Sequence, residues 1–99
     1  MFNFEFIDPN TYVTTSDYAL LKGKIKQESV RTELEKLKQG EKILIDQQSS
    51  TPYSTVNIYL EYVGDYPSKR TGKFERAYCF LKQVVNSSSF TLCSFKFII

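Results

Sequence analysis

The sequence predicts an α+β fold, in which a four-stranded antiparallel meander and a short N-terminal strand pack on one helix. Three observations predict it: one segment with helical periodicity, four later segments with strand character, and polar turns that join those strands in succession. The chain has 99 residues, of which 41% are hydrophobic and 24% charged, as is typical of one folded domain, here residues 1–99.

A short strand is predicted at the N-terminus. Phe2, Phe4 and Phe6 alternate with polar residues, and this alternation places the three rings on one face of a strand. The strand ends at residues 8–10, Asp-Pro-Asn, which favour a turn.

The next segment, residues 11–27, fits two interpretations. In the first, Ser16 or Asp17 is the N-cap of a short helix that Gly23 ends. In the second, residues 18–26 form an irregular strand. Both remain open.

A helix is clearly predicted over residues 29–39. Ser29 is a suitable N-cap, and Gly40 lies where a residue in the left-handed conformation ends a helix. Three apolar residues recur at helical spacing: Val30, Leu34 and Leu37. Because this apolar stripe is narrow, we expect one face of the helix to pack on the sheet and the rest to face solvent.

Four strands are predicted after the helix, over residues 42–47, 55–63, 74–85 and 90–98. The turns between them are residues 48–54, 64–73 and 86–89. If each turn closes its hairpin symmetrically, the register follows by counting. The pairs that face each other are then Ile45–Ile58, Leu60–Ala77, Glu61–Arg76, Phe80–Phe95 and Tyr78–Phe97.

This register sorts the meander into two faces, because side chains alternate along a strand. We expect the helix to cover an aliphatic face, which includes Ile43, Ile45, Ile58, Leu60, Ala77 and Cys79. The other face mixes polar residues with aromatic ones, namely Tyr59, Tyr78, Phe80, Phe95 and Phe97.

The aromatic face is the first candidate binding surface. Aromatic side chains on an exposed sheet can stack unpaired bases, which makes Tyr59, Tyr78 and Phe80 candidate contacts for single-stranded nucleic acid. The favoured interpretation is structural: a second small core, covered by the N-terminal strand or by a partner subunit in a homodimer. Docking of a different protein is a further alternative.

The second candidate is the basic loop PSKRTGKFER, residues 67–76. Its partner-binding candidates are Lys69, Arg70, Lys73 and Arg76. A phosphate-binding P-loop is excluded because a strand, not a helix, follows the Gly-Lys pair. The favoured interpretation is a solvated hairpin tip, and contact with nucleic acid or with an acidic protein surface is the alternative.

The composition argues against catalysis. The chain has no His, and its two Cys lack the spacing of a metal site. Glu61 is expected to pair with Arg76 across strands, not to act as an acid or base. We therefore expect no enzyme activity, no cofactor and no metal.

The location is predicted to be cytoplasmic. No apolar run approaches the length of about 20 residues that crosses a membrane, and the N-terminus does not have the pattern of a signal peptide. Cys79 and Cys93 lie in apolar runs, and in the predicted register they point to opposite faces, so we expect two free thiols.

The composition also favours a function class. Phe, Tyr and Lys are abundant while Gly and Pro are few, which is typical of A/T-rich coding in a low-GC bacterium or its phages. The sequence thus favours a small phage- or mobile-element-encoded inhibitor that docks on a host nucleic-acid-processing or defence enzyme, of the anti-CRISPR or anti-restriction type. The alternative is a single-stranded nucleic-acid-binding protein that uses the aromatic face and the basic loop.

Overall fold

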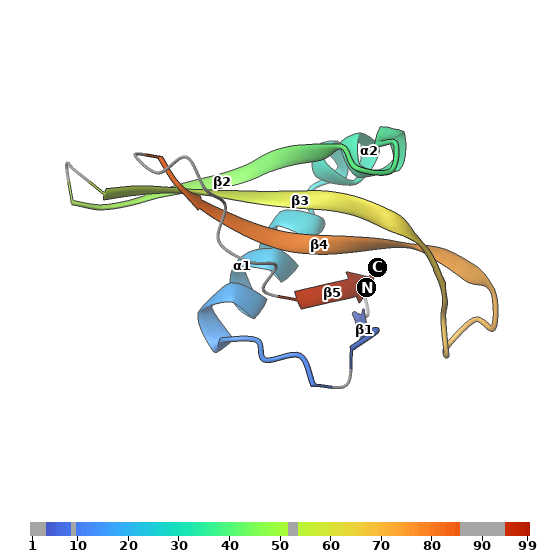
Figure 1. Ribbon diagram of the computed structural model, residues 1–99. Coiled ribbons are helices and arrows are strands. Elements are labelled where there is room, and N and C mark those ends of the chain that lie inside the picture. The colour runs from blue at the N-terminus through green and yellow to red at the C-terminus, as the bar shows by residue number, and fades with distance from the viewer. Residues whose placement is uncertain (1–3, 9, 52–53, 86–94) are drawn as a thin grey trace.

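The computed structural model describes residues 4–8, 10–51, 54–85 and 95–99. Within them, five strands form one antiparallel sheet and two helices pack on the sheet (Figure 1). The α+β class is therefore confirmed. The finer prediction is wrong in two respects, because the N-terminal strand belongs to the same sheet and because a second helix lies within residues 11–27.

That second helix, α1 (Thr15–Ile25), occupies the segment with two interpretations, so the helical one is correct. Its N-cap is Thr14, whose Oγ1 accepts the backbone N–H of Asp17 at 3.0 Å. Gly23 lies inside the helix and does not end it. The helix buries Leu21 and Ile25, one turn apart, against the core.

The predicted helix is α2 (Glu28–Lys36), which begins at Glu28 with Gln27 as its N-cap and ends before Leu37, whose backbone is extended. Leu34 is buried, and Val30 packs against the core from its side, as the apolar stripe predicts. Gly40 has a φ of +92°, but it lies in the turn beyond the helix. No helix in the described part of the chain is long and apolar enough to cross a membrane.

The strands are β1 (Glu5–Phe6), β2 (Lys42–Thr51), β3 (Ser54–Pro67), β4 (Phe74–Val84) and β5 (Phe95–Ile98). Their order in the sheet is β1-β5-β4-β3-β2. The two edges are therefore β2 and the very short β1. Bulges interrupt β2 after Leu44 and after Ser49, and such irregularities hinder edge pairing with other chains.

One hairpin has the predicted register. Phe80 faces Phe95 and Tyr78 faces Phe97 between β4 and β5. Between β2 and β3 the predicted register holds only at the start of β2, because the bulge at Ile45 places Asp46 opposite Ile58.

The predicted register between β3 and β4 is wrong by three residues. Leu60 faces Phe80 instead of Ala77, and Glu61 faces Cys79 instead of Arg76. The cause is Gly64, where the sequence predicts the start of the turn. It forms a bulge with a φ of +124°, a conformation that glycine tolerates, and β3 continues beyond it to Pro67.

A shift by an odd number of residues exchanges the two faces of β4. Tyr78 and Phe80 therefore share a face with Ile58 and Leu60, whereas Ala77 and Cys79 lie on the opposite face. The helices cover the first face, as contacts of α1 with Lys82 and of α2 with Arg76 show. The core on this face includes Leu21, Ile25, Leu34, Ile58, Leu60, Tyr78, Phe80, Phe95 and Phe97.

The N-terminal strand packs its rings against this aromatic core as an edge strand of the same sheet, whereas the sequence predicts that it covers a second core on the other face. The ring of Phe4 lies edge-on to Phe97 with centroids 5.7 Å apart, and Phe6 lies edge-on to Phe95 at 5.8 Å. Both phenylalanines also contact Tyr18 of α1. Phe2 lies outside the described residues.

Cys79 takes part in a disulfide, so the prediction of a free thiol there is wrong. The prediction assumed that the β4–β5 register extends past Phe80 and Phe95, but the described ladder ends at that pair. Cys93 lies outside the described residues. The expectation of a cytoplasmic protein thereby loses the support that reduced cysteines would have supplied.

Candidate functional site

The basic loop is a tight turn at the end of the long β3–β4 hairpin. Because β3 continues to Pro67, the turn is limited to residues 68–73. Ser68 N–H donates to the carbonyl of Lys73, and Gly72 N–H donates to the carbonyl of Ser68, each at 2.9 Å. The hairpin bends toward β1, so its tip meets a strand that is distant in sequence (Figure 1).

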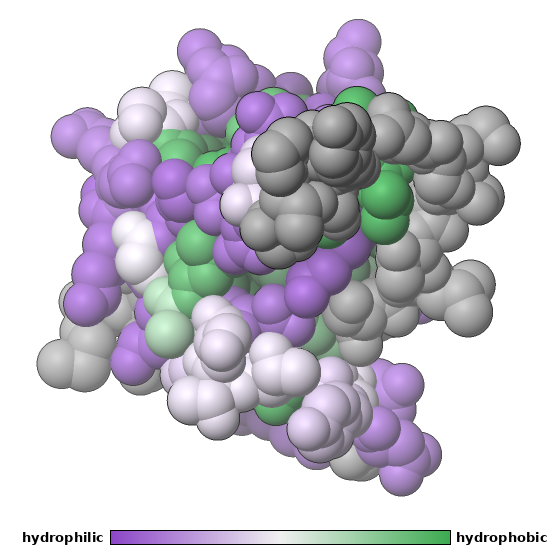
Figure 2. All heavy atoms as spheres, turned by 90° about the vertical axis from the view of Figure 1, so that its left-hand side faces the viewer, coloured by the Kyte–Doolittle hydropathy of each residue, from purple (hydrophilic) through white to green (hydrophobic). Residues whose placement is uncertain are grey.

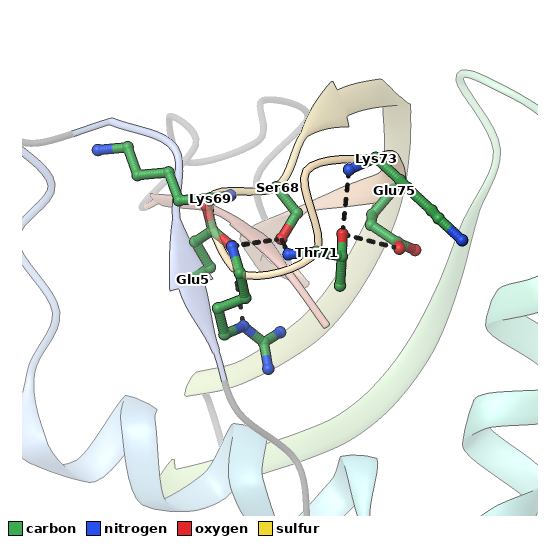
Figure 3. Close-up of polar contacts among 7 residues, drawn as sticks. Glu5, Ser68, Lys69, Thr71, Lys73 and Glu75 are labelled. Atoms are coloured by element: carbon green, nitrogen blue, oxygen red, sulfur yellow. Dashed lines mark hydrogen bonds and ion pairs between the residues drawn. The ribbon is translucent and has the colours of Figure 1, made fainter.

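The tip is anchored on the carboxylate of Glu5 in β1 (Figure 3). Ser68 Oγ donates to Glu5 Oε2 at 2.7 Å, and Lys69 N–H donates to Glu5 Oε1 at 2.5 Å. Arg70 Nε lies 3.8 Å from Oε2 as an ion pair. Three consecutive residues of the turn thus contact a single carboxylate.

These contacts lower the pKa of Glu5 below its ordinary value. The main cause is the hydrogen bond from the backbone of Lys69, followed by the hydroxyl of Ser68, and Arg70 adds a smaller effect. Each donor favours the charged form of the carboxyl group. Glu5 is therefore ionised at neutral pH.

The other arm of the turn is held by Glu75. Thr71 Oγ1 donates to Glu75 Oε1 at 3.3 Å and accepts the backbone N–H of Lys73 at 3.2 Å (Figure 3). The turn is thus tied on both sides to carboxylates, which fixes its backbone relative to β1 and β4.

The side chains at the tip face solvent. Lys69, Lys73 and Phe74 are exposed, and Phe74 is 72% exposed, which is unusual for a phenylalanine. Lys69 and Lys73 extend away from each other (Figure 3). Arg70 is also exposed, but its guanidinium is engaged with Glu5. The tip therefore presents two cations and one aromatic ring on an anchored backbone.

The fourth predicted cation, Arg76, does not belong to this surface. Its Nη2 donates to the carbonyls of Leu34, at 3.2 Å, and of Leu37. Its Nε donates to the hydroxyl of Tyr78 at 3.1 Å, and its guanidinium lies 3.8 Å from the centroid of the Tyr62 ring. Arg76 therefore holds the end of α2 on the sheet.

The three predicted aromatic contacts are not brought together. Tyr78 and Phe80 are buried beneath the helices, at 3% and 0% exposure. Tyr59 is half-buried on the opposite face of the sheet. Its hydroxyl accepts from Asn57 and donates to Gln83, both at 3.3 Å, and Lys42 lies 5.9 Å from its ring centroid.

Two cavities in the described part of the chain show no recognisable catalytic or ligand-binding arrangement. One of about 260 Å³ lies between α2 and β4, where Arg31 and Arg76 face Glu35 and Glu75. Both arginines are engaged with helix C-termini, since Arg31 Nη1 donates to the carbonyl of Ile25 at 3.3 Å. A second, open cavity of about 370 Å³ lies beside the N-terminal turn. Its lining includes Ile7, Asp8, Asn10, Thr11, Tyr12, Tyr66 and Lys96.

Exposed large apolar side chains also occur outside the tip, at Tyr12, Leu44, Val84 and Val85. In the view of Figure 2, the described side chains are largely hydrophilic, with small apolar areas between them. Among the residues that the structure describes, no three carboxylate, His or Cys side chains gather as metal ligands would. The hairpin tip combines the exposed ring of Phe74 with the exposed side chains of Lys69 and Lys73.

The cations of this site are visible in the sequence, but its anchors, Glu5 and Ser68, are not. The two residues are 63 positions apart, so no local pattern connects them. Comparisons of the chain with protein-family models, curated proteins and solved structures found no match.

Proposed function

We propose that the protein is a small non-enzymatic binding protein that docks on another protein through its basic hairpin tip. The observation that carries this proposal is the exposure of Lys69, Lys73 and Phe74 on a turn held by two carboxylates. Exposed aromatic residues are typical anchors of protein interfaces, and cations steer association with acidic surfaces. A turn that is already ordered loses less conformational entropy on binding.

The proposed partner is a nucleic-acid-processing or defence enzyme of a bacterial host, and the protein is its phage- or mobile-element-encoded inhibitor. The nucleic-acid groove of such an enzyme is basic and would repel Lys69 and Lys73. Its catalytic centre commonly holds metal ions with carboxylates, which attract cations. We therefore place the complementary surface at an acidic patch, such as a carboxylate cluster near the catalytic centre.

The alternative function is binding of single-stranded nucleic acid. Its support is Phe74, which could stack one base next to the cations of the tip. Against it stands the burial of Tyr78 and Phe80, because a buried ring cannot stack a base. The docking proposal is favoured for this reason.

A cytoplasmic location belongs to the proposal of a host-enzyme inhibitor. The disulfide at Cys79 counts against it, because disulfides are rare in reducing compartments. Titration of thiols in the denatured, unreduced protein tests this point: two free thiols fit the cytoplasm, and none fits an oxidising compartment.

The proposal is tested by capture with matched variants. The double variant Lys69→Gln/Lys73→Gln removes two exposed cations of the tip and leaves Glu5, Ser68 and Arg70 in place. The control Lys26→Gln/Lys36→Gln makes the same change of charge at two exposed positions, one directly after α1 and one at the end of α2.

Each protein is immobilised and exposed to the soluble proteins of a low-GC bacterium at about 0.15 M salt. We expect a protein that the wild type and the control retain, and that the tip variant retains at least about tenfold less, which corresponds to about 1.4 kcal/mol. Equal capture by the two double variants would contradict docking through the tip.

A further inference from the structure

Glu5, which anchors the hairpin tip, lies on the shortest strand of the sheet. Glu5 lies on β1, a two-residue edge strand, where it pairs with Ile98. Ile98 pairs in turn with Ala77, which places Glu5 on the face of the sheet away from the helices. The side chain of Glu5 is nevertheless only 12% exposed, because the hairpin tip covers it.

The hydroxyl of Ser68 connects this carboxylate to the rest of the turn. Ser68 is 3% exposed and donates its hydroxyl hydrogen to Glu5. The same oxygen accepts the backbone N–H groups of Arg70, at 3.2 Å, and Thr71, at 3.4 Å. Because the donation to Glu5 sets the direction of the hydroxyl, its lone pairs face those two N–H groups.

We propose that Glu5 is the positioning residue of the docking surface, whose carboxylate holds the hairpin tip in the shape that presents Lys69, Lys73 and Phe74. The role in docking rests on the proposed function, whereas the hold on the tip is a property of the free protein. Glu5 itself contacts no partner in this account.

The hydrogen bonds of the turn explain why one carboxylate has this effect. Regular pairing of β3 and β4 ends at Pro67 and Phe74. Of the next backbone N–H groups, that of Lys69 is bound by Glu5 directly, and those of Arg70 and Thr71 are bound through the Ser68 hydroxyl. Hydrogen bonds to an ionised acceptor are stronger than those between neutral groups, so charge matters as well as shape.

The ionised state of Glu5 supports this role. Its donors lower its pKa, so their contribution to stability is present above the ordinary pKa of a glutamate and is lost as the pH falls through the lowered value. The charged group that faces Glu5 is Arg70, while the ammonium of Lys69 extends away from it (Figure 3). The tip should therefore loosen only in acid.

The first test measures amide hydrogen exchange in the free protein. Glu5→Gln keeps the shape of the side chain but removes its charge and turns an N–H₂ group toward one of the two donors. Glu41→Gln is the matched control, because Glu41 Oε1 also accepts a backbone N–H, that of Lys38 at 2.6 Å. It makes the same change of charge.

We expect the amide of Lys69 to exchange at least about tenfold faster in Glu5→Gln than in the wild type, and Glu41→Gln to leave it unchanged, in line with local opening of about 1.4 kcal/mol. Unchanged exchange at Lys69 in folded Glu5→Gln would overturn the inference. If Glu5→Gln does not fold, Ser68→Ala provides the test, through faster exchange at Arg70 and Thr71, and unchanged exchange there would overturn the inference equally.

The second test uses the protein that the wild type captures and that Lys69→Gln/Lys73→Gln does not. We expect Glu5→Gln to capture it several-fold less than Glu41→Gln does. Equal capture by these two variants, with a loosened tip in Glu5→Gln, would overturn the positioning role and leave the proposed function standing. Full capture by the lysine variant would overturn the proposed function, while the exchange result would still decide whether Glu5 holds the tip.

Discussion

Arg76 of β4 donates a hydrogen bond from its guanidinium to the carbonyl of Leu34 in α2, at 3.2 Å. The last carbonyls of a helix have no partner within the helix, and a cation near them interacts favourably with the helix dipole. A strand residue therefore closes the C-terminal end of a helix and fastens it to the sheet.

The first prediction concerns this contact. Arg76→Ala removes the side-chain donor to the carbonyl of Leu37, one of several donors to the carbonyl of Leu34, and the group stacked on Tyr62, so it should lower the free energy of unfolding by about 2–3 kcal/mol. Lys73→Ala, at an exposed position of the same hairpin, should change it by less than about 0.5 kcal/mol. Urea denaturation measures both, and equal values for the two variants would contradict the capping role.

A second prediction compares two leucines. Leu34 is 2% exposed in the core, whereas Leu44 is 52% exposed on β2. Leu34→Ala should cost about 2–5 kcal/mol of stability, because it leaves a cavity between α2 and the sheet. Leu44→Ala should cost less than about 1 kcal/mol. A loss below about 1 kcal/mol at Leu34 would place α2 elsewhere.

Replacement of Gly23 and of Gly64 by Ala should change the stability of the protein in opposite directions. Gly23 lies within α1, and a Cβ atom there would meet nothing within 4 Å, so Gly23→Ala should stabilise the protein by about 0.5–1 kcal/mol. Gly64 has a φ of +124°, so Gly64→Ala should destabilise it by about 1 kcal/mol or more. Thermal melts detect both shifts, and a lower melting temperature for Gly23→Ala would argue against a continuous α1.

Stability should fall at alkaline pH. The hydroxyl of Tyr62 donates to Asp65 Oδ1 at 2.5 Å, and this bond is the main cause of a raised pKa for Tyr62; burial raises the pKa of Tyr78. In the unfolded chain both hydroxyls ionise near pH 10. The unfolded state therefore loses protons first, so the stabilisation is complete below about pH 10 and is lost as the pH rises through the higher folded values.

The Tyr62→Phe variant tests this pH dependence. It removes one of the two groups, so its stability should decline less steeply above about pH 10 than that of the wild type. Denaturation curves at a series of alkaline pH values measure the two slopes. Parallel slopes would mean that the hydrogen bond to Asp65 does not persist in solution.

Part of the fold could be predicted from local patterns. The predicted pairing of Phe80 with Phe95 is correct, although the polar residues 86–89 from which it was counted lie outside the described part of the chain. The β3–β4 register was predicted wrongly, because the sequence does not show whether Gly64 begins a turn or forms a bulge. Only the packing of the two helices on Leu60 and Phe80 distinguishes these cases, and packing is not a local property.

The candidate site was predictable to a similar extent. Lys69 and Lys73 were identified because charge in a predicted loop is visible in the sequence. Arg76 carries the same charge, but the corrected register turns it toward the carbonyls of α2. Glu5 could not be found, since its role depends on a hairpin that bends back to β1.

Whether the tip docks on protein or binds nucleic acid is tested most directly by titration with fluorescent single strands. The wild type is added to mixed-sequence DNA and RNA of about 20 nucleotides at about 0.15 M salt, and the titration is repeated at lower salt. Because Tyr78 and Phe80 are buried, we expect no binding tighter than about 1 μM at the higher salt concentration. Tighter binding that weakens with salt and is lost in Lys69→Gln/Lys73→Gln would contradict protein docking and establish the nucleic-acid alternative.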